Sequence, residues 1–238
     1  MATETETSPR VQRRRARNRT TMLDVAEAKF AADGIAAVRI EAIAEAADVS
    51  VGTVYGHFGN KDGLIVAVAE RILDRAGLYL AQAYEVSDSP LEQVAATGAA
   101  YLHLLADFPF LIRFLSTDLA TADPAVTSQI TARIEVMYAV LSDRIEAAIT
   151  VGQVKPLDAR LLARFLFGAW NGVFSLTIQS DATRMSTDEV EQCLAQARRI
   201  IIDGIATPAM HDANGHATVT LHDVPRPAPI EDPVASTG

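Results

Sequence analysis

The sequence predicts an all-α protein of about nine helices. Most of the chain consists of stretches whose apolar residues recur every three or four positions, which is the spacing of an amphipathic helix. Helix-start signals open several of these stretches, among them Ser89-Pro90 and Asp123-Pro124. No segment shows the polar-apolar alternation of a half-buried strand. We therefore expect no sheet.

The stretch from Arg39 to Lys61 predicts two short helices around a tight turn. Asp48 favours a turn, and Ser50 is a good N-cap because its hydroxyl accepts a hydrogen bond from the backbone N–H three residues on. The second helix is therefore expected to begin at Val51, and Gly59-Asn60 to close it and cap the next helix. The apolar face of the first helix comprises Ile40, Ile43, Ala44 and Ala47.

The second helix of this pair has the surface that a DNA-recognition helix needs. Its apolar residues are Val54, Tyr55 and Phe58, and the opposite face carries Val51, Gly52, Thr53, Gly56 and His57. This face is small and hydroxylic at its N-terminal end. Bulky residues there would hold the helix out of the major groove.

The same stretch resembles a known family in the order and spacing of its residues. The agreeing positions are Ile43-Ala44, Ala46-Ala47, Val49-Ser50, Gly52-Thr53, Tyr55, His57-Phe58 and Lys61. At these positions the chain resembles the TetR family of bacterial transcriptional regulators, of the TetR/AcrR type. The resemblance extends back to about Arg19 and forward to Ile72, and it implies a first helix that contains Leu23, Ala26 and Phe30.

Three residues depart from the family pattern. Arg39 stands where the family commonly has a capping Thr, so the cap is lost or the helix start shifts. Asp48 replaces the usual turn Gly, and Val51 replaces a frequent Lys. We expect these changes to alter operator sequence and salt dependence rather than to abolish DNA binding.

The resemblance and the residue chemistry together imply a set of DNA contacts. Gly52 and Thr53 let the helix approach base edges and phosphate, while Tyr55 and His57 contact phosphates or brace the helix. Lys61 adds a charge-assisted phosphate contact. The full candidate DNA-binding set is Arg17, Arg19, Arg39, Ser50, Val51, Gly52, Thr53, Tyr55, His57 and Lys61.

The charge distribution also favours DNA binding at this end of the chain. Residues 1–80 hold equal numbers of acidic and basic side chains, so the whole net charge of −9 comes from residues 81–238. Six arginines crowd the segment just before the helix-turn-helix: Arg10, Arg13, Arg14, Arg15, Arg17 and Arg19. Such a block is either a solvated tail or a phosphate-binding arm, and its position favours the arm.

The sequence predicts further helices after the helix-turn-helix and divides the chain into four regions. Helices are expected from residue 60 to about 84, from 90 to 106, from 124 to about 151, from 156 to 179 and from 187 to 205, with a Phe-rich segment after residue 107. Residues 1–18 are predicted to be a flexible basic arm and 19–65 a helix-turn-helix DNA-binding domain. Residues 66–207 are predicted to be a helical regulatory, ligand-binding and dimerisation domain. The polar, Pro-rich residues 208–238 are predicted to be a disordered tail.

The last two helices, at 156–179 and 187–205, predict a homodimer. The first is apolar nearly all round, and the second carries an apolar stripe, so the pair from each subunit would form a four-helix interface. The family also dimerises there. Two recognition helices about 34 Å apart read a palindromic operator on double-stranded DNA, whereas one touches too few bases.

Aromatic residues with a few polar ones predict a pocket for a small, hydrophobic effector. The same aromatic side chains would equally fill a core. Asn171 is more diagnostic, because a buried amide needs a partner in the protein or in the ligand. The candidate ligand-binding set is His103, Phe110, Arg113, Phe114, Tyr138, Phe167, Trp170, Asn171 and Phe174.

The sequence therefore predicts a ligand-responsive repressor released from its operator by the effector. The alternative is an all-helical interaction protein or enzyme that does not bind DNA, but no catalytic triad, phosphate-binding Gly loop or metal-spaced carboxylate pair is present. We expect no cofactor and no metal, a small buried role for Cys193, no membrane segment and a cytoplasmic protein.

Overall fold

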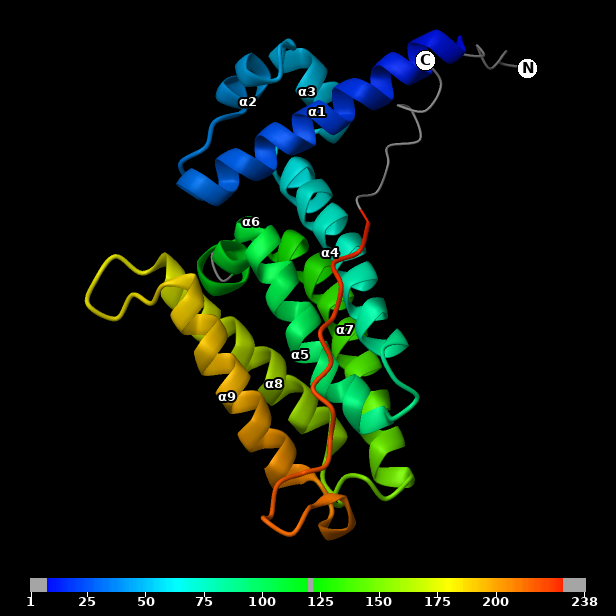
Figure 1. The fold of residues 1–238 in the computed structure, drawn as a ribbon. Coiled ribbons are helices and arrows are strands. Elements are labelled where there is room, and N and C mark those ends of the chain that lie inside the picture. Colours follow the sequence, from blue (N-terminus) through cyan, green and yellow to red (C-terminus); the bar gives the residue numbers. More distant parts are fainter. Residues whose placement is uncertain (1–7, 120–121, 229–238) are drawn as a thin grey trace. The chain divides into compact units, whose positions relative to one another are not determined.

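The computed structural model describes residues 8–119 and 122–228, which form two compact units (Figure 1). The first unit ends at Ala69 and the second comprises Glu70–Pro227. The described residues contain nine α-helices, and their only β-pairing consists of two isolated bridges, Val154 with Ala206 and His211 with Ala217. The all-α prediction is confirmed.

The first unit consists of three helices and the start of a fourth. These are α1 (Pro9–Asp33), α2 (Ile40–Ala46), α3 (Val51–Phe58) and the first turns of α4 (Lys61–Glu85). Its largest fully buried side chains are Met22, Phe30, Ile43 and Leu64. The apolar face predicted for the first helix of the pair therefore lies in this core.

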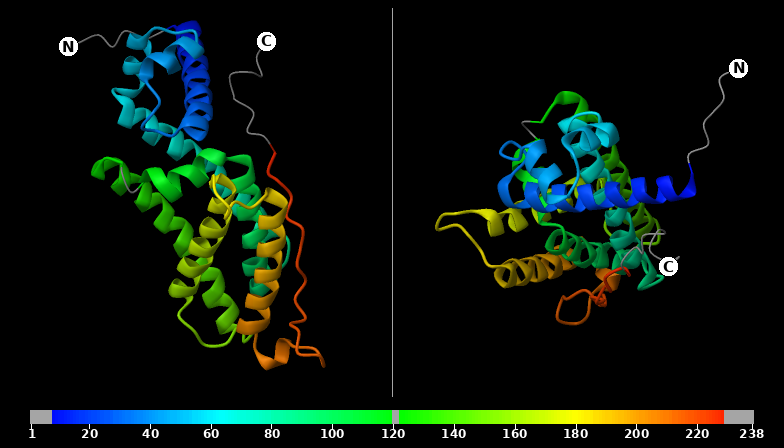
Figure 2. Two further views of the ribbon diagram at one scale, coloured as in Figure 1. Left: turned by 90° about the vertical axis from the view of Figure 1, so that its left-hand side faces the viewer. Right: turned by 90° about the horizontal axis from the view of Figure 1, so that it is seen from above.

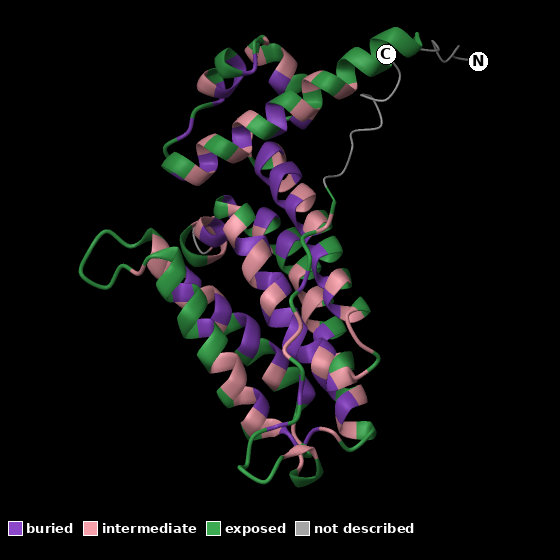
Figure 3. Ribbon diagram, viewed as in Figure 1, coloured by how far each residue is buried: buried purple, intermediate pink, exposed green. Residues whose placement is uncertain are grey.

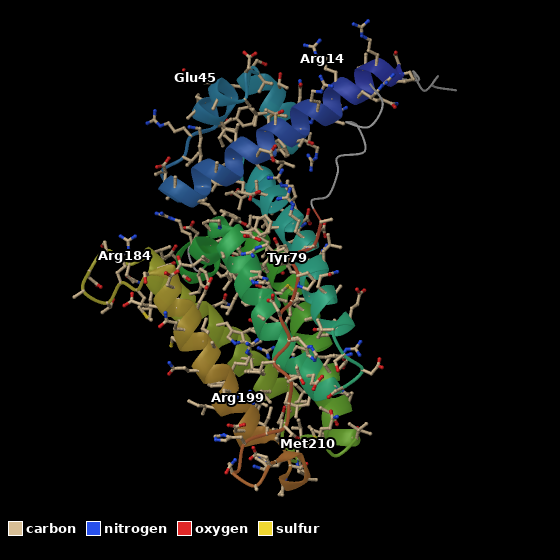
Figure 4. All side chains as sticks on the ribbon, in the orientation of Figure 1. Arg14, Glu45, Tyr79, Arg184, Arg199 and Met210 are labelled. Atoms are coloured by element: carbon tan, nitrogen blue, oxygen red, sulfur yellow. The ribbon has the colours of Figure 1, made fainter. Side chains whose placement is uncertain are left out.

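The predicted flexible arm is wrong for the residues that the structure describes. Helix α1 begins at Pro9, directly after its N-cap Ser8, and carries the arginine block on exposed turns. Arg14 extends from this part of the helix in Figure 4. Arginine is a good helix former, and the block continues a helix whose nucleation cost is already met by its packed C-terminal half. Residues 1–7 lie outside the described part.

The second unit is a helical bundle. It contains most of α4, then α5 (Pro90–Asp107), α6 (Pro109–Arg113) with the π-helical turn η1 (Phe114–Asp118), and α7 (Pro124–Thr150). It continues with α8 (Ala159–Ser175), the 3₁₀ turn η3 (Leu176–Ile178) and α9 (Thr187–Ile205). Helix α8 packs against α5, α7 and α9. Buried positions of this unit lie on α4, α5, α7 and α8 (Figure 3).

One segment of this unit has the length and composition of a membrane span. In the described chain only Ala159–Ile178 passes this test among single helices, with 28% of its apolar window buried. It includes Arg160 and Arg164, both of which pair with Glu135 on α7. A core helix of a bundle has the same composition.

The predicted disordered tail is also wrong up to residue 228. Residues 207–228, the C-terminal strap, contain the 3₁₀ turn η4 (Pro208–Met210) and then run beside α5 (Figures 1 and 2). Ala217, Val219 and Val224 are buried, and the first two pack in a cluster with Leu91 and other core residues. These small apolar residues are enough to order the strap, because they pack against core surface that the helices already form. Residues 229–238 lie outside the described part.

The predicted buried role of Cys193 is wrong as well. This thiol lies on the exposed side of α9. The helix buries Val190, Leu194 and Ile202, and Cys193 lies one position before the buried Leu194.

Candidate nucleic-acid interface and ligand cavity

Helix α3 begins where the sequence predicts, at a side-chain cap. The Ser50 hydroxyl accepts from the backbone N–H of Thr53 at 3.1 Å and lies 2.8 Å from the Thr53 hydroxyl. Helix α2 begins differently: Arg39 is its N-cap residue, but its side chain makes no capping hydrogen bond. The first alternative for Arg39, loss of the cap, is therefore confirmed.

The turns on both sides of α3 use special backbone geometry. Asp48 has a φ of 52°, the left-handed region that favours Gly, so its departure from the family pattern places a strained residue in the turn. After α3, Gly59 has a φ of 77° and Asn60 caps α4 by accepting from the Gly63 N–H at 2.8 Å. A Cβ on Gly63 would lie 2.0 Å from the Phe58 carbonyl oxygen. Only Gly fits this approach.

The outer face of α3 is open. A Cβ on Gly52 would meet only the Ser50 hydroxyl, at 3.8 Å, and a Cβ on Gly56 would meet nothing within 4 Å. Val54 and Phe58 are buried, whereas the Tyr55 side chain is 45% exposed. The assignment of Tyr55 to the apolar face is therefore wrong, and this phenol is free to contact a partner. Val51, Thr53 and His57 are half-buried.

Helix α1 brings cations to the end of α3. The Arg19 guanidinium lies 4.7 Å from the centroid of the Phe58 ring, a cation–π arrangement. Burial lowers the pKa of His57, and the nearby charges of Arg15 and Arg19 lower it further. Arg15 and Arg19 thus form a cationic cluster beside the His57 ring at α3. An anion is the ligand that such a cluster favours.

Sequence reasoning missed Arg15 as part of this cluster. Arg15 lies one helical turn before Arg19, so helical spacing was the signal, but the arm was expected to be flexible. Arg17 and Arg39 are exposed, and Lys61 is half-buried at the start of α4. The candidate DNA residues therefore all lie in the first unit, on α1, α3 and α4 and at the N-caps of α2 and α3.

Most aromatic residues predicted for a ligand pocket pack against one another. Phe110 and Phe114 stack with their ring centroids 5.3 Å apart. Phe167 contacts Tyr101, Tyr138 and Trp170 at centroid distances between 4.9 and 5.2 Å. Phe110, Phe114, Phe167 and Phe174 are buried. These side chains therefore lie in the core, as the alternative to a ligand pocket predicts.

Asn171 finds its partner within the protein. The Tyr101 hydroxyl donates to its side-chain oxygen at 2.8 Å, and burial raises the pKa of Tyr101 despite that bond. Sequence reasoning missed Tyr101, and the signal was a lone phenol in the apolar helix α5. Arg113 is half-buried at the end of α6.

Two predicted ligand residues line a cavity of about 300 Å³. His103 from α5 and Trp170 from α8 form part of its wall, together with Arg198 of α9 and Arg226 of the C-terminal strap. A second cavity, of about 320 Å³, lies between α4 and α7 and is lined mainly by Leu73, Leu80, Tyr84, Val136, Met137 and Val140. Both volumes lie at the lower end for small-molecule sites.

The family comparison agrees with the helix-turn-helix geometry. Residues 22–68 match the sequence profile described as bacterial regulatory proteins, tetR family. This segment of the chain therefore carries a tetR-family helix-turn-helix sequence. The matched segment covers α2 and α3 and most of the first unit's core. No curated protein sequence matches the chain.

Solved structures of regulators share the fold of this chain. The ketosteroid transcriptional regulator KstR2 of Mycobacterium tuberculosis has 21% identity and a TM-score of 0.61, over 79% of this chain and 95% of that one. FadR of Bacillus subtilis, in complex with stearoyl-CoA, has 20% identity and a TM-score of 0.60, over 74% and 96%. AibR, in complex with isovaleryl coenzyme A and operator DNA, has 18% identity and a TM-score of 0.62, over 75% and 97%. The chain has the fold of a tetR-family transcriptional regulator.

Proposed function

We propose that the protein is a homodimeric transcriptional repressor that binds a palindromic operator through α3 and is released by a small effector. The observation that carries the DNA-binding part is the cationic cluster of Arg15 and Arg19, next to His57 and the open face of α3. Such a cluster favours phosphates as ligands, and the small residues at the start of α3 leave room for base edges.

Exposed apolar side chains on α8 and α9 support the dimer. Leu161 and Phe165 are one turn apart on α8 and are 65% and 59% exposed, and Ile200 on α9 is 70% exposed. Large apolar side chains gathered on neighbouring helices mark an interaction surface. A second copy of the same two helices would cover them and complete a four-helix interface.

The structural neighbours support an effector with an acyl group. Two of them are complexes with coenzyme A thioesters, isovaleryl coenzyme A in AibR and stearoyl-CoA in FadR. Two cavities in the second unit of this chain offer apolar walls. We propose a small effector with an apolar part for this protein, which would favour a conformation of low operator affinity.

The DNA-binding proposal is tested by a mobility-shift titration on the DNA upstream of its own coding region. Lys61→Gln should lower affinity and reduce the slope of log affinity against log salt by about 0.9, because one phosphate contact is lost. Lys155→Gln is the matched control, since this lysine bonds the Gly204 carbonyl in the second unit. Equal slopes for both variants and the wild type would remove Lys61 from the interface.

The pH dependence of the same assay tests His57. A bound phosphate raises the pKa of His57, which burial and Arg15 hold below 6.5 in the free protein. Binding therefore takes up a proton, so operator affinity should rise as the pH falls from neutral to mildly acidic values. His57→Gln should flatten this rise. A wild-type affinity that is constant from neutral to mildly acidic pH contradicts a role for this imidazole.

The dimer is tested by light scattering at micromolar concentration. Phe165→Glu places a charge on the exposed face of α8 and should convert the dimer to a monomer. Val136→Glu is the matched control, because Val136 on α7 is 60% exposed, close to the 59% of Phe165. A monomeric wild-type protein would refute the homodimer.

A further inference from the structure

The cavity of about 300 Å³ in the second unit combines apolar walls with cationic groups. Helix α5 contributes Gly98 and Leu102, α8 contributes Trp170, and α9 contributes Leu194. Gly98 lets the indole approach α5 closely, because a Cβ there would lie 3.2 Å from the Trp170 ring. The C-terminal strap supplies another wall through Arg226. The cavity therefore joins four segments that are distant in the sequence.

Arg198 brings a cation with unsatisfied hydrogen-bond donors to this cavity. Its Nε and Nη1 atoms are buried and have no hydrogen-bond partner among residues 8–119 and 122–228. Burial lowers the pKa of Arg198, the charge of Arg199 lowers it further, and Asp223 on the strap opposes both. A guanidinium nevertheless stays protonated in proteins. Buried guanidinium N–H groups without acceptors are costly, so an acceptor that enters the cavity is stabilised.

The other charged and polar groups of the wall leave Arg198 as the available cation. The Arg226 Nε already donates to the Asp107 carboxylate at 2.8 Å. His103 has a buried Nδ1 with no partner in the described chain, which adds a second polar atom for a ligand. Glu191 is the acidic residue of the wall, but it is exposed, so solvent and salt screen its charge.

A second, apolar cavity also borders Arg198. A small cavity of about 20 Å³ shares Trp170 and Arg198 with the larger one. Its other walls include Val94, Leu166 and Ile202. The space thus has a charged group beside apolar surface, and that combination is complementary to a molecule with one anionic end and a short apolar body.

We propose that this cavity is a binding site for a small carboxylate with a short apolar body, with Arg198 as the counter-ion. A carboxylate offers two acceptors in the geometry that matches the Nε and Nη atoms of a guanidinium. The inference deepens the proposed effector response by naming a site and a ligand class. It rests on that proposal only for its regulatory consequence, because binding is measured on the protein without DNA.

The chain provides its own probe, because Trp170 is its only tryptophan and lines the cavity. Octanoate should change the intrinsic fluorescence of the full-length protein in a saturable manner. Octanol has the same apolar body without the charge, so its affinity should be roughly tenfold to a hundredfold lower, the effect of one lost charge-assisted interaction. Equal affinity for the two probes, or no saturable response to octanoate, overturns the proposal.

Three variants separate the charge of Arg198 from its packing. Arg198→Gln should reduce octanoate affinity to that of octanol while leaving octanol binding unchanged, and Arg198→Lys should retain most of the octanoate affinity. Arg184→Gln is the matched control, because Arg184 lies on the loop before α9 (Figure 4). Unchanged octanoate affinity in Arg198→Gln refutes the site. If Arg198→Gln loses both probes, octanoate binding by Arg198→Lys supports the site and its absence refutes it.

The regulatory proposal fails separately from the binding site. A mobility-shift assay with and without saturating octanoate reports on operator release, and the fluorescence titration reports on the cavity alone. Loss of DNA binding with intact octanoate binding would contradict the proposed repressor and leave the Arg198 site standing. Operator binding without any fluorescence response to octanoate would refute the Arg198 site and leave the proposed repressor standing.

Discussion

The turn between α2 and α3 and the C-terminal strap are both irregular segments, but different kinds of contact hold them. In the turn, the Val49 N–H donates to the Ala44 carbonyl at 3.0 Å. The Ser50 hydroxyl caps α3 by accepting from the N–H of Thr53, three residues on. In the strap, the Thr220 N–H and the His222 ring contact the Glu92 carboxylate at 3.1 and 2.8 Å, across more than a hundred residues of sequence.

This difference shows that the two segments depend on different parts of the chain. The turn uses neighbours within five residues, so its geometry follows from its own sequence. The strap depends on carboxylates of α5, namely Glu92 and Asp107, and Asp107 also accepts from the Tyr79 hydroxyl at 2.6 Å. Substitutions in the turn should therefore act locally, whereas substitutions of the strap's anchors should act at a distance.

The largest effect is expected from Gly63→Ala. The added Cβ would lie 2.0 Å from the Phe58 carbonyl oxygen, so α3 and α4 would have to separate. We expect a loss of about 3 kcal/mol in the free energy of unfolding, measured by urea denaturation. Gly77→Ala is the matched control on the same helix, with nothing within 4 Å of its Cβ. It should gain about 1 kcal/mol. Similar outcomes for both variants would mean that the close approach is absent.

The second largest effect is expected from Glu92→Gln, which tests the strap. Loss of its charged hydrogen bonds should cost about 2 kcal/mol and speed the hydrogen exchange of the Thr220 amide. Glu85→Gln, at the exposed end of α4, is the control. Unchanged exchange at Thr220 in Glu92→Gln would show that the carboxylate does not hold the strap.

The pH dependence of stability sharpens the test of Glu92. Burial opposes its ionisation, but hydrogen bonds from Ser87, His222 and the Thr220 N–H outweigh burial and lower its pKa from 4.5 to about 2. The stabilisation is therefore complete above about pH 4.5 and is lost as the pH falls towards 2. Glu92→Gln should lack this component of the acid-induced loss.

A smaller effect, of opposite sign, is expected from Arg39→Thr. A Thr at this N-cap should accept from the first turn of α2 and add about 1 kcal/mol of stability. It should also reduce the salt slope of operator binding by about 0.9, if Arg39 contacts a phosphate. Arg39→Gln removes the charge without a good cap, so it should change the slope alone. A salt slope that neither variant alters would show that Arg39 acts only through the helix start.

The smallest effect is expected from Asp48→Gly. A non-Gly residue pays about 1–2 kcal/mol for a left-handed backbone, and the greater freedom of Gly in the unfolded chain offsets part of the gain. The net gain should be about 0.5 kcal/mol by urea denaturation. Asp48→Asn should change little, because Asn also tolerates this conformation. A loss of stability in Asp48→Gly would mean that the carboxylate itself holds the turn.

The sequence was most informative where neighbouring residues carry the signal. Ser50 as a cap, Asn60 as the next cap and the departure at Arg39 were all readable, because a cap acts within three residues. The sequence did not predict the exposure of Tyr55, because its burial on α3 depends on how far the core of the first unit extends. It also failed for Cys193, where a shift of one position on a helix exchanges a buried side for an exposed one.

Periodicity and capping are local, so the helical class, the helix-turn-helix and its caps could be predicted from neighbouring residues alone. The three-dimensional structure was needed to show that Arg15 and Arg19 join His57, that residues 207–228 form a strap, and that Arg198 lies in a cavity beside Trp170. Each of these depends on groups brought together from distant positions by the burial of apolar surface. Composition alone cannot show which apolar surface remains open to receive a polar, Pro-rich segment.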